Sequence, residues 1–278
     1  MLSEFGEDAK VLAGGQSLIP LLKLRFANPS HLVDLNFIPG MSYIKEEDGR
    51  LRFGALTRHS EIEASPVAAK IPIIHDCAAG IADVQVRNRG TIGGSLAEAD
   101  PSGDWATVLL TLDTEIRCHN GKNDHRVQLS DFIKDAYTTV LTHNELVSEV
   151  IVKSPPKNSG GAYLAFKRSA PVYPTASAAV QLTMEGDICK DAAVGLGCVG
   201  LTAIKAKDAE SALSGQKVTD KAIAAAVEAA RAAADPQSDM RGSAEYKRTL
   251  VGALVKRAIE FAKRRARGEQ VDVSHIYA

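Results

Sequence analysis

Cysteine is scarce in this 278-residue sequence, and its spacing excludes two kinds of site. The four cysteines are Cys77, Cys118, Cys189 and Cys198, and they form no CxxC pair or other metal-ligand spacing. The seven histidines include no HxxxH pair, so we expect no zinc or iron–sulfur site made by this chain alone. Cysteines so far apart in a chain of this length imply no disulfide framework, which favours a reducing, cytoplasmic location.

Long apolar runs and an excess of one charge are also missing. No stretch approaches the ~18 apolar residues of a membrane span, and Met1–Phe5 lacks the basic and apolar segments of a secretory signal. A formal net charge of -1 gives no general attraction to nucleic acid or to an acidic membrane surface. We therefore expect no nucleic-acid partner and no membrane span. With 45% apolar and 24% charged residues, the chain is an ordinary globular protein with room for two or three compact units.

Doubled glycines are the most informative feature that is present. One lies in Ala13–Ser17, after the apolar pair Val11 and Leu12, and the other lies in Thr91–Ser95. Glycine can adopt φ > 0 and lets backbone approach a ligand closely, while successive free N–H groups form an anion-binding concavity. No GxxxxGK[ST] motif occurs, and the first loop does not match GxGxxG either. Either loop alone predicts a tight turn, but the pair with its flanks predicts two walls of one phosphate site.

Charged and polar residues near these loops have competing interpretations. Arg87 and Arg89 precede the second loop, and we rank ion pairing or loop anchoring slightly ahead of direct phosphate contact. Asp104 comes just before a predicted helix, where it is either an N-cap or an acceptor for ligand hydroxyls. His59 follows a strand end, and because nothing nearby in the sequence positions it, we expect a polar surface residue.

Hydrophobic periodicity divides the chain into two main parts. Strands are predicted at 11–12, 32–35, 51–54 and 146–152, and helices after residue 18, from Ser65, from Pro72 and after Asp104. Pro155–Gly161 is rich in proline and glycine and is predicted to be the linker between the main domains. Strands follow at 162–167, 176–184 and 193–199, and the middle one alternates as if one face were wet.

The rest of the chain is predicted to be helical. One helix covers 222–234, and a last one runs from an N-cap at Ser243 to Gly268. The last helix carries eight basic residues around an apolar face: Lys247, Arg248, Lys256, Arg257, Lys263, Arg264, Arg265 and Arg267. We expect this basic face to be solvated or to contact another protein.

Five segments, in this order, resemble one protein family. They are AGGQSLIPLLKLR from Ala13, HLVDL from His31, IADVQVRNRGTIGGSLAEADPSGD from Ile81, FKR from Phe166 and DMRGSAEYKRTLVGALVKRA from Asp239. The chain resembles the FAD-binding medium subunit of the molybdenum hydroxylases, a group that includes bacterial carbon monoxide dehydrogenase, xanthine dehydrogenase and related aldehyde and N-heterocycle dehydrogenases. The segments are spread over nearly the whole chain, and two glycine loops at this separation with an acidic turn after the second make the signature specific.

The resemblance implies an α+β fold. Residues 1–156 would form a vanillyl-alcohol-oxidase-like (PCMH-type) FAD-binding domain of two α/β subdomains, at about 1–48 and 49–156. Residues 161–278 would form a smaller C-terminal domain with a three-stranded antiparallel sheet and helices. The chain lacks the strand and most of the helix that usually precede the first glycine loop, which implies either a trimmed first subdomain or an internal start.

The resemblance also implies a binding site for FAD. Two loops would hold the FAD pyrophosphate: Ala13, Gly14, Gly15, Gln16, Ser17 and Leu18 in the first, and Thr91, Ile92, Gly93, Gly94 and Ser95 in the second. Asp104 would contact the cofactor, and Ile81 and Val147 would line its pocket. Lys167 would lie near the flavin end. Tyr173 is the nearest candidate for the family's aromatic residue against the isoalloxazine ring, although its surroundings differ from the usual Gly-Asp-Tyr-Ala-like run.

Finally, the resemblance implies partners and an electron-transfer role. A large molybdopterin subunit would oxidise the substrate, and a small subunit with two [2Fe–2S] clusters would pass electrons to FAD on this chain. FAD would deliver them to a quinone, NAD+ or dioxygen, in a dimer of heterotrimers. Carbon monoxide, an aldehyde, a purine and an N-heterocycle all stay open as substrates, since another polypeptide selects the substrate.

Two other hypotheses for the function stay open at this point. One is a self-sufficient FAD-dependent oxidoreductase of the same fold, which would need its own acid or base beside the flavin. The other is a non-catalytic nucleotide-binding scaffold subunit that keeps the fold without the redox role.

Overall fold

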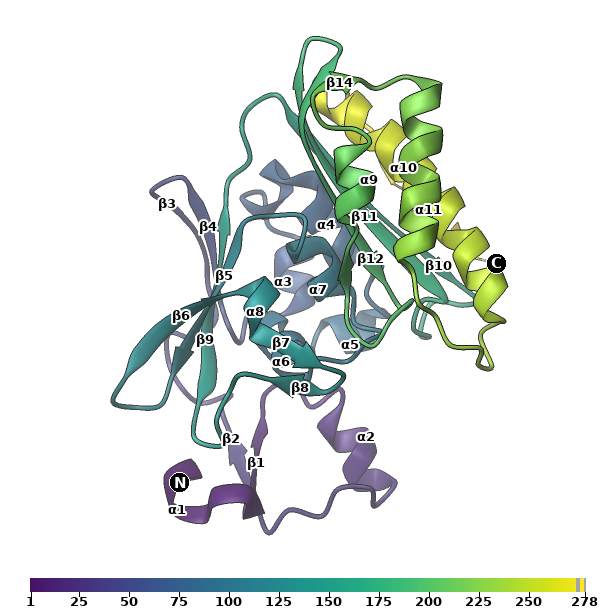
Figure 1. The fold of residues 1–278 in the computed structure, drawn as a ribbon. Coiled ribbons are helices and arrows are strands. Elements are labelled where there is room, and N and C mark those ends of the chain that lie inside the picture. Colours follow the sequence, from purple (N-terminus) through teal and green to yellow (C-terminus); the bar gives the residue numbers. More distant parts are fainter. Residues whose placement is uncertain (274–275, 278) are drawn as a thin grey trace.

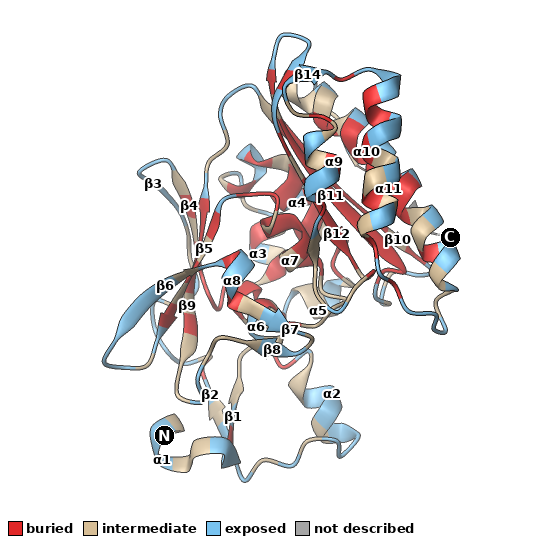
Figure 2. Cartoon of the chain, viewed as in Figure 1, coloured by how far each residue is buried: buried red, intermediate tan, exposed pale blue. Residues whose placement is uncertain are grey.

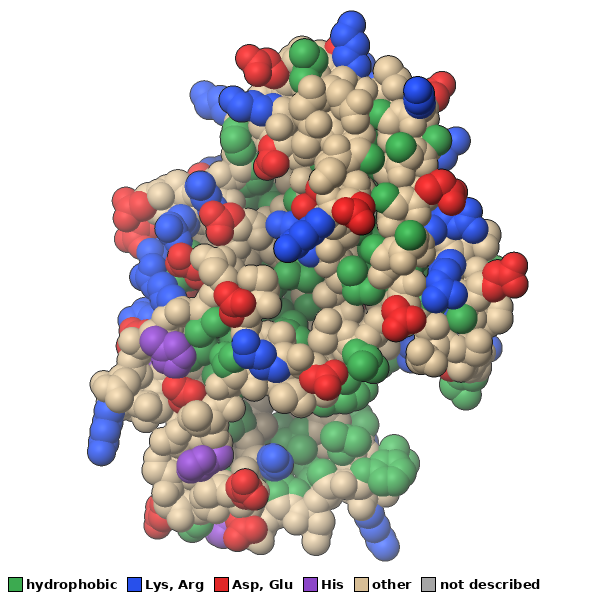
Figure 3. Space-filling view, in the orientation of Figure 1, with side chains coloured by type: hydrophobic (Ala, Val, Ile, Leu, Met, Phe, Trp, Pro, Cys, Tyr) green, Lys and Arg blue, Asp and Glu red, His purple; other side chains and the backbone are tan. Residues whose placement is uncertain are grey.

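The computed structural model describes residues 1–273 and 276–277 and consists of three parts (Figure 1). We call residues 1–40 the N-terminal lobe, residues 41–153 the central body and residues 159–273 the C-terminal body. Charged side chains of both signs are interspersed over the face seen in Figure 3, in keeping with the net charge of -1. Among the described residues, no helix has both the length and the hydropathy needed to cross a membrane.

The N-terminal lobe is a small α/β unit. Strand β1 (Ala9–Leu12) pairs in parallel with β2 (His31–Asp34), and helix α2 (Leu18–Lys23) lies between them in sequence. Helix α1 (Leu2–Phe5) and the 3-10 turn η1 (Gly6–Asp8) precede β1. The strands and the helix predicted in this region are therefore confirmed, and the first glycine loop connects β1 to α2.

The central body contains a five-stranded antiparallel sheet in the order β3-β4-β9-β5-β6. Its strands are β3 (Ile44–Glu47), β4 (Arg50–Gly54), β5 (Thr114–His119), β6 (Asp124–Gln128) and β9 (Leu146–Lys153). On β4 the alternation is clear, because Leu51 and Phe53 are buried in the core while Arg50 and Arg52 form ion pairs with Glu115 and Glu149.

Short helices cover the inner face of this sheet. They are α3 (His59–Glu63), η2 (Ala68–Lys70), α4 (Pro72–Gly80), α5 (Val84–Arg87), α6 (Ile92–Glu98), α7 (Asp104–Leu109) and α8 (Leu129–Phe132), with the two-stranded ribbon β7 (Ile133–Asp135) and β8 (Thr138–Thr139). The helix predicted from Pro72 is confirmed. The helix predicted from Ser65 is wrong, because the Ser65 hydroxyl accepts the N–H of Ala68 and only a 3-10 turn follows.

The C-terminal body is built on three long antiparallel strands, β10 (Ser159–Lys167), β11 (Ala176–Glu185) and β12 (Ile188–Gly197). Three short strands extend this sheet: β13 (Ile204–Lys205), β14 (Gln216–Lys217) and β15 (Ile276–Tyr277). Helices α9 (Lys207–Ser211), α10 (Asp220–Ala233) and α11 (Ala244–Ala266) complete it. The Ser243 side chain accepts the N–H of Tyr246, so the predicted N-cap of the last helix is confirmed.

Both faces of the sheet are buried along most of β10 and β11, and this corrects the prediction of a wet face (Figure 2). Ala162 and Leu164 on β10 face the core formed with α10 and α11, whereas Tyr163 and Ala165 face the core of the central body. On β11, Ser177 and Gln181 are buried as well, because α4 and α7 cover that side of the sheet. Polar residues at alternate positions here mark an interface between two bodies rather than a solvated surface.

The predicted linker is shorter than expected because β10 already begins at Ser159. Gly160 lies against helix α11, where an added Cβ would come within 2.2 Å of the carbonyl oxygen of Ala262. Gly160 therefore allows a close approach between β10 and α11, while Gly161 leaves room for the side chains of Gln181 and Ile73, and neither glycine provides a hinge.

Two basic residues of the last helix are buried, contrary to the expected solvated face. The Nζ of Lys247 lies 2.8 Å from the carboxylate of Asp239, and its side chain is 4% exposed. Arg265 forms a bidentate pair with Asp76 on α4, with Nη1 2.5 Å from Oδ2 and Nη2 3.0 Å from Oδ1. The Asp76 pair joins the C-terminal body to the central body.

His59 is buried, and this corrects the prediction of a surface residue. Its Nδ1 accepts a hydrogen bond from Nε1–H of Trp105 at 3.1 Å, and its backbone N–H donates to the carbonyl oxygen of Gly90. Burial, reinforced by the charges of Arg58 and Arg87, lowers the pKa of His59 from 6.5 to about 3. The imidazole is therefore neutral, with its proton on Nε2.

The buried pair between Asp76 and Arg265 should contribute strongly to stability. Replacing Asp76 by alanine leaves a buried guanidinium without its carboxylate, which we expect to lower the free energy of unfolding by about 3–5 kcal/mol. The matched control is Asp187→Ala, because the pair between Arg267 and Asp187 is largely exposed and is worth less than about 1 kcal/mol. Urea unfolding of the two variants provides the comparison, and equal effects would contradict the structural role of the buried pair.

His59 should make the chain sensitive to acid. Because the folded-state pKa lies below the unfolded value, the unfolded chain binds the proton first, and stability is lost as the pH falls from 6.5 toward 3. In His59→Asn, whose amide oxygen can still accept from Trp105, the loss of unfolding free energy between about pH 7 and about pH 5 should shrink by about 2 kcal/mol. Urea titrations at both pH values measure this difference, and an unchanged pH dependence would show that His59 is not buried in its neutral form.

Candidate functional site

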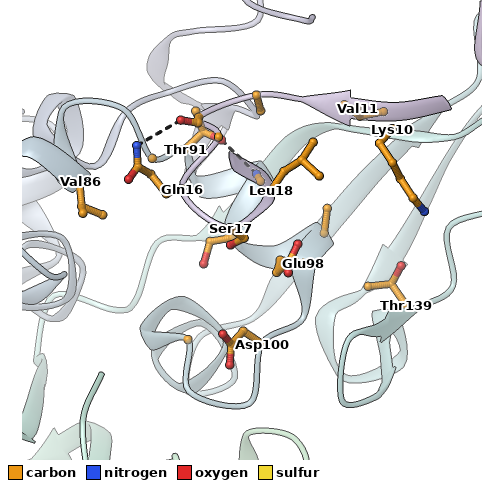
Figure 4. A pocket seen from close by; sticks show the side chains of 18 of the residues that line it. Lys10, Val11, Gln16, Ser17, Leu18, Val86, Thr91, Glu98, Asp100 and Thr139 are labelled. Atoms are coloured by element: carbon orange, nitrogen blue, oxygen red, sulfur yellow. Dashed lines mark hydrogen bonds between the residues drawn. The ribbon is translucent and has the colours of Figure 1, made fainter. Parts of the chain in front are cut away.

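A cavity of about 800 Å³ lies where the three parts of the molecule meet. Its walls come from the first glycine loop of the N-terminal lobe, from the second glycine loop with the acidic turn after it, and from β10 and the segment beyond β10. Figure 4 shows Gln16, Ser17 and Thr91 of the two loops with Glu98 and Asp100 across the pocket. The volume falls within the range of roughly 300–1,000 Å³ that is common for ligand pockets.

The first glycine loop follows β1 and turns at Gly15, whose φ of 71° favours glycine. Gly14 lies against the two residues that precede the second loop: an added Cβ would come within 2.4 Å of the carbonyl oxygen of Arg89 and 2.7 Å of the Cα of Gly90. No other residue type fits there without moving one of the loops. The first loop is thus in direct contact with the backbone that leads into the second loop.

The second glycine loop is ordered by a side-chain cap. The hydroxyl of Thr91 accepts the N–H of Gly94 at 3.1 Å, which begins helix α6. An added Cβ at Gly94 would meet this hydroxyl at 2.6 Å and the Cβ of Ala13 at 3.7 Å. Gly93 has a different role, because it packs against Ala55 at the end of β4.

A buried carboxylate and a buried ammonium line another part of the cavity. Asp104 is 6% exposed and accepts a hydrogen bond from the Tyr163 hydroxyl at 2.6 Å. Burial raises the pKa of Asp104, while the positive charge of Lys167 opposes the rise. Lys167 is 1% exposed and donates to the carbonyl oxygen of Gly80. The N-cap interpretation of Asp104 is wrong, because Gly103 caps α7 and Asp104 is the first residue of that helix.

Tyr173 also lines the cavity and is 44% exposed. The guanidinium of Arg241 lies 5.5 Å from the centre of its ring and donates to the hydroxyl of Ser102 at 3.0 Å. Burial, and then the carboxylate of Asp100, raise the pKa of Tyr173. The aromatic ring is therefore held between the C-terminal body and the acidic turn.

Most of the residues singled out from the sequence line this one cavity. They are Ala13, Gly14, Gly15, Gln16, Ser17, Leu18, Ile81, Thr91, Gly94, Ser95, Asp104, Lys167 and Tyr173. Three others are not among its lining residues. Ile92 is in the hydrophobic core, Gly93 packs on Ala55, and Val147 lies on β9 in the core of the central body.

Sequence reasoning missed several cavity residues. His59 lines the cavity beside Gly90, and Lys10, Glu98 and Asp100 add charged groups. The position of His59 after a strand end was a usable signal, but the Trp105 partner that fixes it lies 46 positions away. Arg87 forms an ion pair with Glu63 at 2.8 Å and donates to the carbonyl oxygen of Ile81, which confirms its predicted anchoring role.

Within residues 1–273 and 276–277, no three His, Cys, Asp or Glu side chains come together in a way that could hold a metal ion. The polar groups around the cavity include backbone amides, hydroxyls, carboxylates, two imidazoles and one buried ammonium. Such groups can bind a phosphate-bearing organic molecule with hydroxyl groups.

Two family models match consecutive parts of the chain. The FAD binding domain in molybdopterin dehydrogenase matches residues 1–155, and the CO dehydrogenase flavoprotein C-terminal domain matches residues 161–262.

Individual relatives match nearly end to end. The carbon monoxide dehydrogenase medium chain of Afipia carboxidovorans is 40% identical over 96% of this chain and 93% of its own length. The 6-hydroxypseudooxynicotine dehydrogenase complex subunit alpha of Paenarthrobacter nicotinovorans is 37% identical over 99% and 94%. A chain in the solved structure of carbon monoxide dehydrogenase from Hydrogenophaga pseudoflava superimposes with a TM-score of 0.93 at 38% identity, covering 95% of this chain and 92% of that one.

These matches extend over both parts of the fold and over both glycine loops. They agree with a mixed α+β FAD-binding domain followed by the C-terminal domain of the carbon monoxide dehydrogenase flavoprotein type. The chain belongs to the family of FAD-binding medium subunits of molybdenum hydroxylases, the flavoprotein subunits of multi-subunit molybdenum dehydrogenases such as carbon monoxide dehydrogenase.

Proposed function

We propose that the cavity between the two glycine loops is the FAD site of this subunit and that the loops bind the FAD diphosphate. One observation carries the proposal: Gly14 lies against the backbone of Arg89 and Gly90, and Gly94 lies near Ala13, so the two loops, about eighty positions apart, meet at a wall of the cavity. A diphosphate bound there can closely approach the backbone of the first loop, whereas the N–H groups of Gly93, Gly94 and Ser95 already donate to Ala55 and Thr91. The cavity volume and the mixture of apolar and polar walls fit a dinucleotide.

The remaining cavity residues are assigned by their chemistry. The Asp104 carboxylate is oriented by the Tyr163 hydroxyl and can accept hydrogen bonds from hydroxyl groups of the cofactor. Lys167 places a buried positive charge near the flavin end, and Tyr173 offers an aromatic face to the ring. Ile81 supplies apolar surface to the pocket. Val147 is not among the cavity-lining residues and packs in the core of the central body.

Bound FAD can exchange electrons one at a time or as a pair, and it supplies the redox chemistry. The role of this chain is to hold the cofactor, order it and shield it from water. We infer that a small partner subunit with two [2Fe–2S] clusters delivers the electrons and that a large molybdopterin subunit oxidises the substrate. Relatives named as dehydrogenase complex subunits, and one solved structure described as a Cu,Mo-CO dehydrogenase, support this inference.

The same family supports several finer assignments that we propose together. The assembly is a dimer of heterotrimers, with a quinone, NAD+ or dioxygen as the terminal acceptor.

The FAD-binding domain covers residues 1–156, with subdomains at about 1–48 and 49–156, and is of the vanillyl-alcohol-oxidase-like type. The C-terminal domain covers 161–278. Two hydrophobic cores, one on each side of the β10–β12 sheet, support this division. We also infer a cytoplasmic location, supported by the four unpaired cysteines.

A substitution in either loop tests the FAD site. Gly14→Asp or Gly94→Asp should abolish flavin retention, because the added Cβ meets the backbone of Arg89 at Gly14 or the Thr91 hydroxyl at Gly94, so a loop must move, and each variant also adds a negative charge beside the diphosphate. The flavin content of the purified complex is read from its visible spectrum after the protein is denatured.

The control for the loop variants is Gly49→Asp. Gly49 lies in the turn between β3 and β4 with no atom within 4 Å of an added Cβ, and aspartate tolerates its left-handed conformation. This control should keep its flavin. Full flavin content in both loop variants would contradict the assignment of the diphosphate site.

A further inference from the structure

The N-terminal lobe has too little core to hold its own position. Within residues 1–40, the buried residues are Ala9, Gly14, Gly15 and Leu35 (Figure 2). Large apolar side chains there are exposed, including Phe26 at 80% and Phe37 at 87%. A unit of about 40 residues seldom buries enough apolar surface to fold alone. The placement of the first glycine loop must therefore depend on contacts with the central body.

A chain of side-chain hydrogen bonds provides such a contact behind the loops. The guanidinium of Arg58 donates through Nη1 to the carbonyl oxygen of Arg89, beside the second glycine loop. Through Nη2 it donates to Oδ1 of Asn36 in the lobe. The Nδ2 of Asn36 in turn donates to the carbonyl oxygen of Ala13, in the first glycine loop, at 2.9 Å. We call Arg58 and Asn36 the clasp.

Each member of the clasp is itself held in place. The backbone N–H of Arg58 donates to the carboxylate of Glu61 at 2.7 Å, and Arg58 forms an isolated antiparallel β-bridge with Thr91. The carboxylate of Asp34 accepts from both the backbone N–H and the side-chain amide of Asn36, at 2.9 and 2.6 Å. The clasp therefore connects two anchored points rather than two mobile side chains.

The clasp lies outside the binding cavity. Neither Arg58 nor Asn36 is among the cavity-lining residues, so neither is placed to contact the cofactor. The planar guanidinium serves two acceptors at once, one on each loop system, which a single ammonium cannot match in geometry. These contacts can act on the cofactor only by setting where the two loops lie relative to each other.

We propose that Arg58 and Asn36 are positioning residues that set the separation of the two glycine loops for the FAD diphosphate. The inference rests on the proposed function, because it concerns the same cofactor. Two sets of contacts then hold the N-terminal lobe against the central body. One is the clasp, outside the cavity, and the other is made with FAD inside the cavity. Losing the clasp lowers FAD affinity and loosens the lobe, while the central body keeps its fold.

The test uses the assembled complex stripped of flavin and titrated with FAD, with binding followed by the quenching of flavin fluorescence. We expect Arg58→Ala to weaken FAD binding by about ten- to a hundredfold, the range that corresponds to losing hydrogen bonds to a charged group. Arg58→Lys should give an intermediate loss. Arg50→Ala is the matched control, because Arg50 pairs with Glu115 on the outer face of the central sheet and should leave FAD affinity unchanged.

Hydrogen exchange measured by mass spectrometry supplies a readout that does not depend on the flavin. In Arg58→Ala, amides of residues 1–40 should exchange faster, whereas those of β4, β5 and β9 should be unchanged. Wild-type FAD affinity and lobe exchange in Arg58→Ala would overturn the inference, as would faster exchange throughout the central body. If Gly14→Asp also keeps its flavin, the proposed FAD site is wrong. If Gly14→Asp loses its flavin while Arg58→Ala behaves as wild type, only the role of the clasp is wrong.

A double mutant tests whether the two residues act as one unit. Asn36→Leu should weaken FAD binding to a similar extent as Arg58→Ala, and the double variant should be no weaker than the stronger single variant. Additive losses would contradict the clasp, because they would mean that Arg58 and Asn36 act on the cofactor by separate routes.

Discussion

The close approach of Gly14 to the carbonyl oxygen of Arg89 determines how near the two glycine loops can come. One loop belongs to a lobe with almost no core of its own, and the other caps a helix of a well-packed body. A side chain at this contact would push the two apart. This contact between backbone atoms forms part of the cavity wall, and it is possible because Gly14 carries no side chain.

The rest of the molecule gives this contact a fixed frame. The β10–β12 sheet is buried on both faces, so the central body and the C-terminal body share one continuous support. The bidentate pair between Asp76 and Arg265 joins α4 to α11 across that support. Lys167 at the end of β10 and Asp104 at the start of α7 belong to this frame, and both are almost fully buried. A rigid frame on one side and a weakly packed lobe on the other suit a subunit that must admit a large cofactor and then hold it.

The sequence predicted the local elements and the main features of the site, because those depend on short-range patterns and on motif order. The strand before the first glycine loop, the proline-initiated helix α4 and the Ser243 cap all follow from neighbouring residues. Long-range packing was not predictable in this way. The alternation of apolar and polar residues on β11 is the same whether one face is solvated or covered by α7. The burial of His59 depends on Trp105, which is distant in the sequence. Gly93 and Gly94 are adjacent and identical, yet only the second faces the cavity.

A map of the assembled complex with FAD bound, obtained by cryo-electron microscopy, tests the central claim most directly. The account predicts density for the cofactor diphosphate between the backbone of Gly14 and Gly15 on one side and that of Gly94 and Ser95 on the other. Cofactor density elsewhere on the subunit, or glycine loops that are separated with only solvent between them, would contradict it.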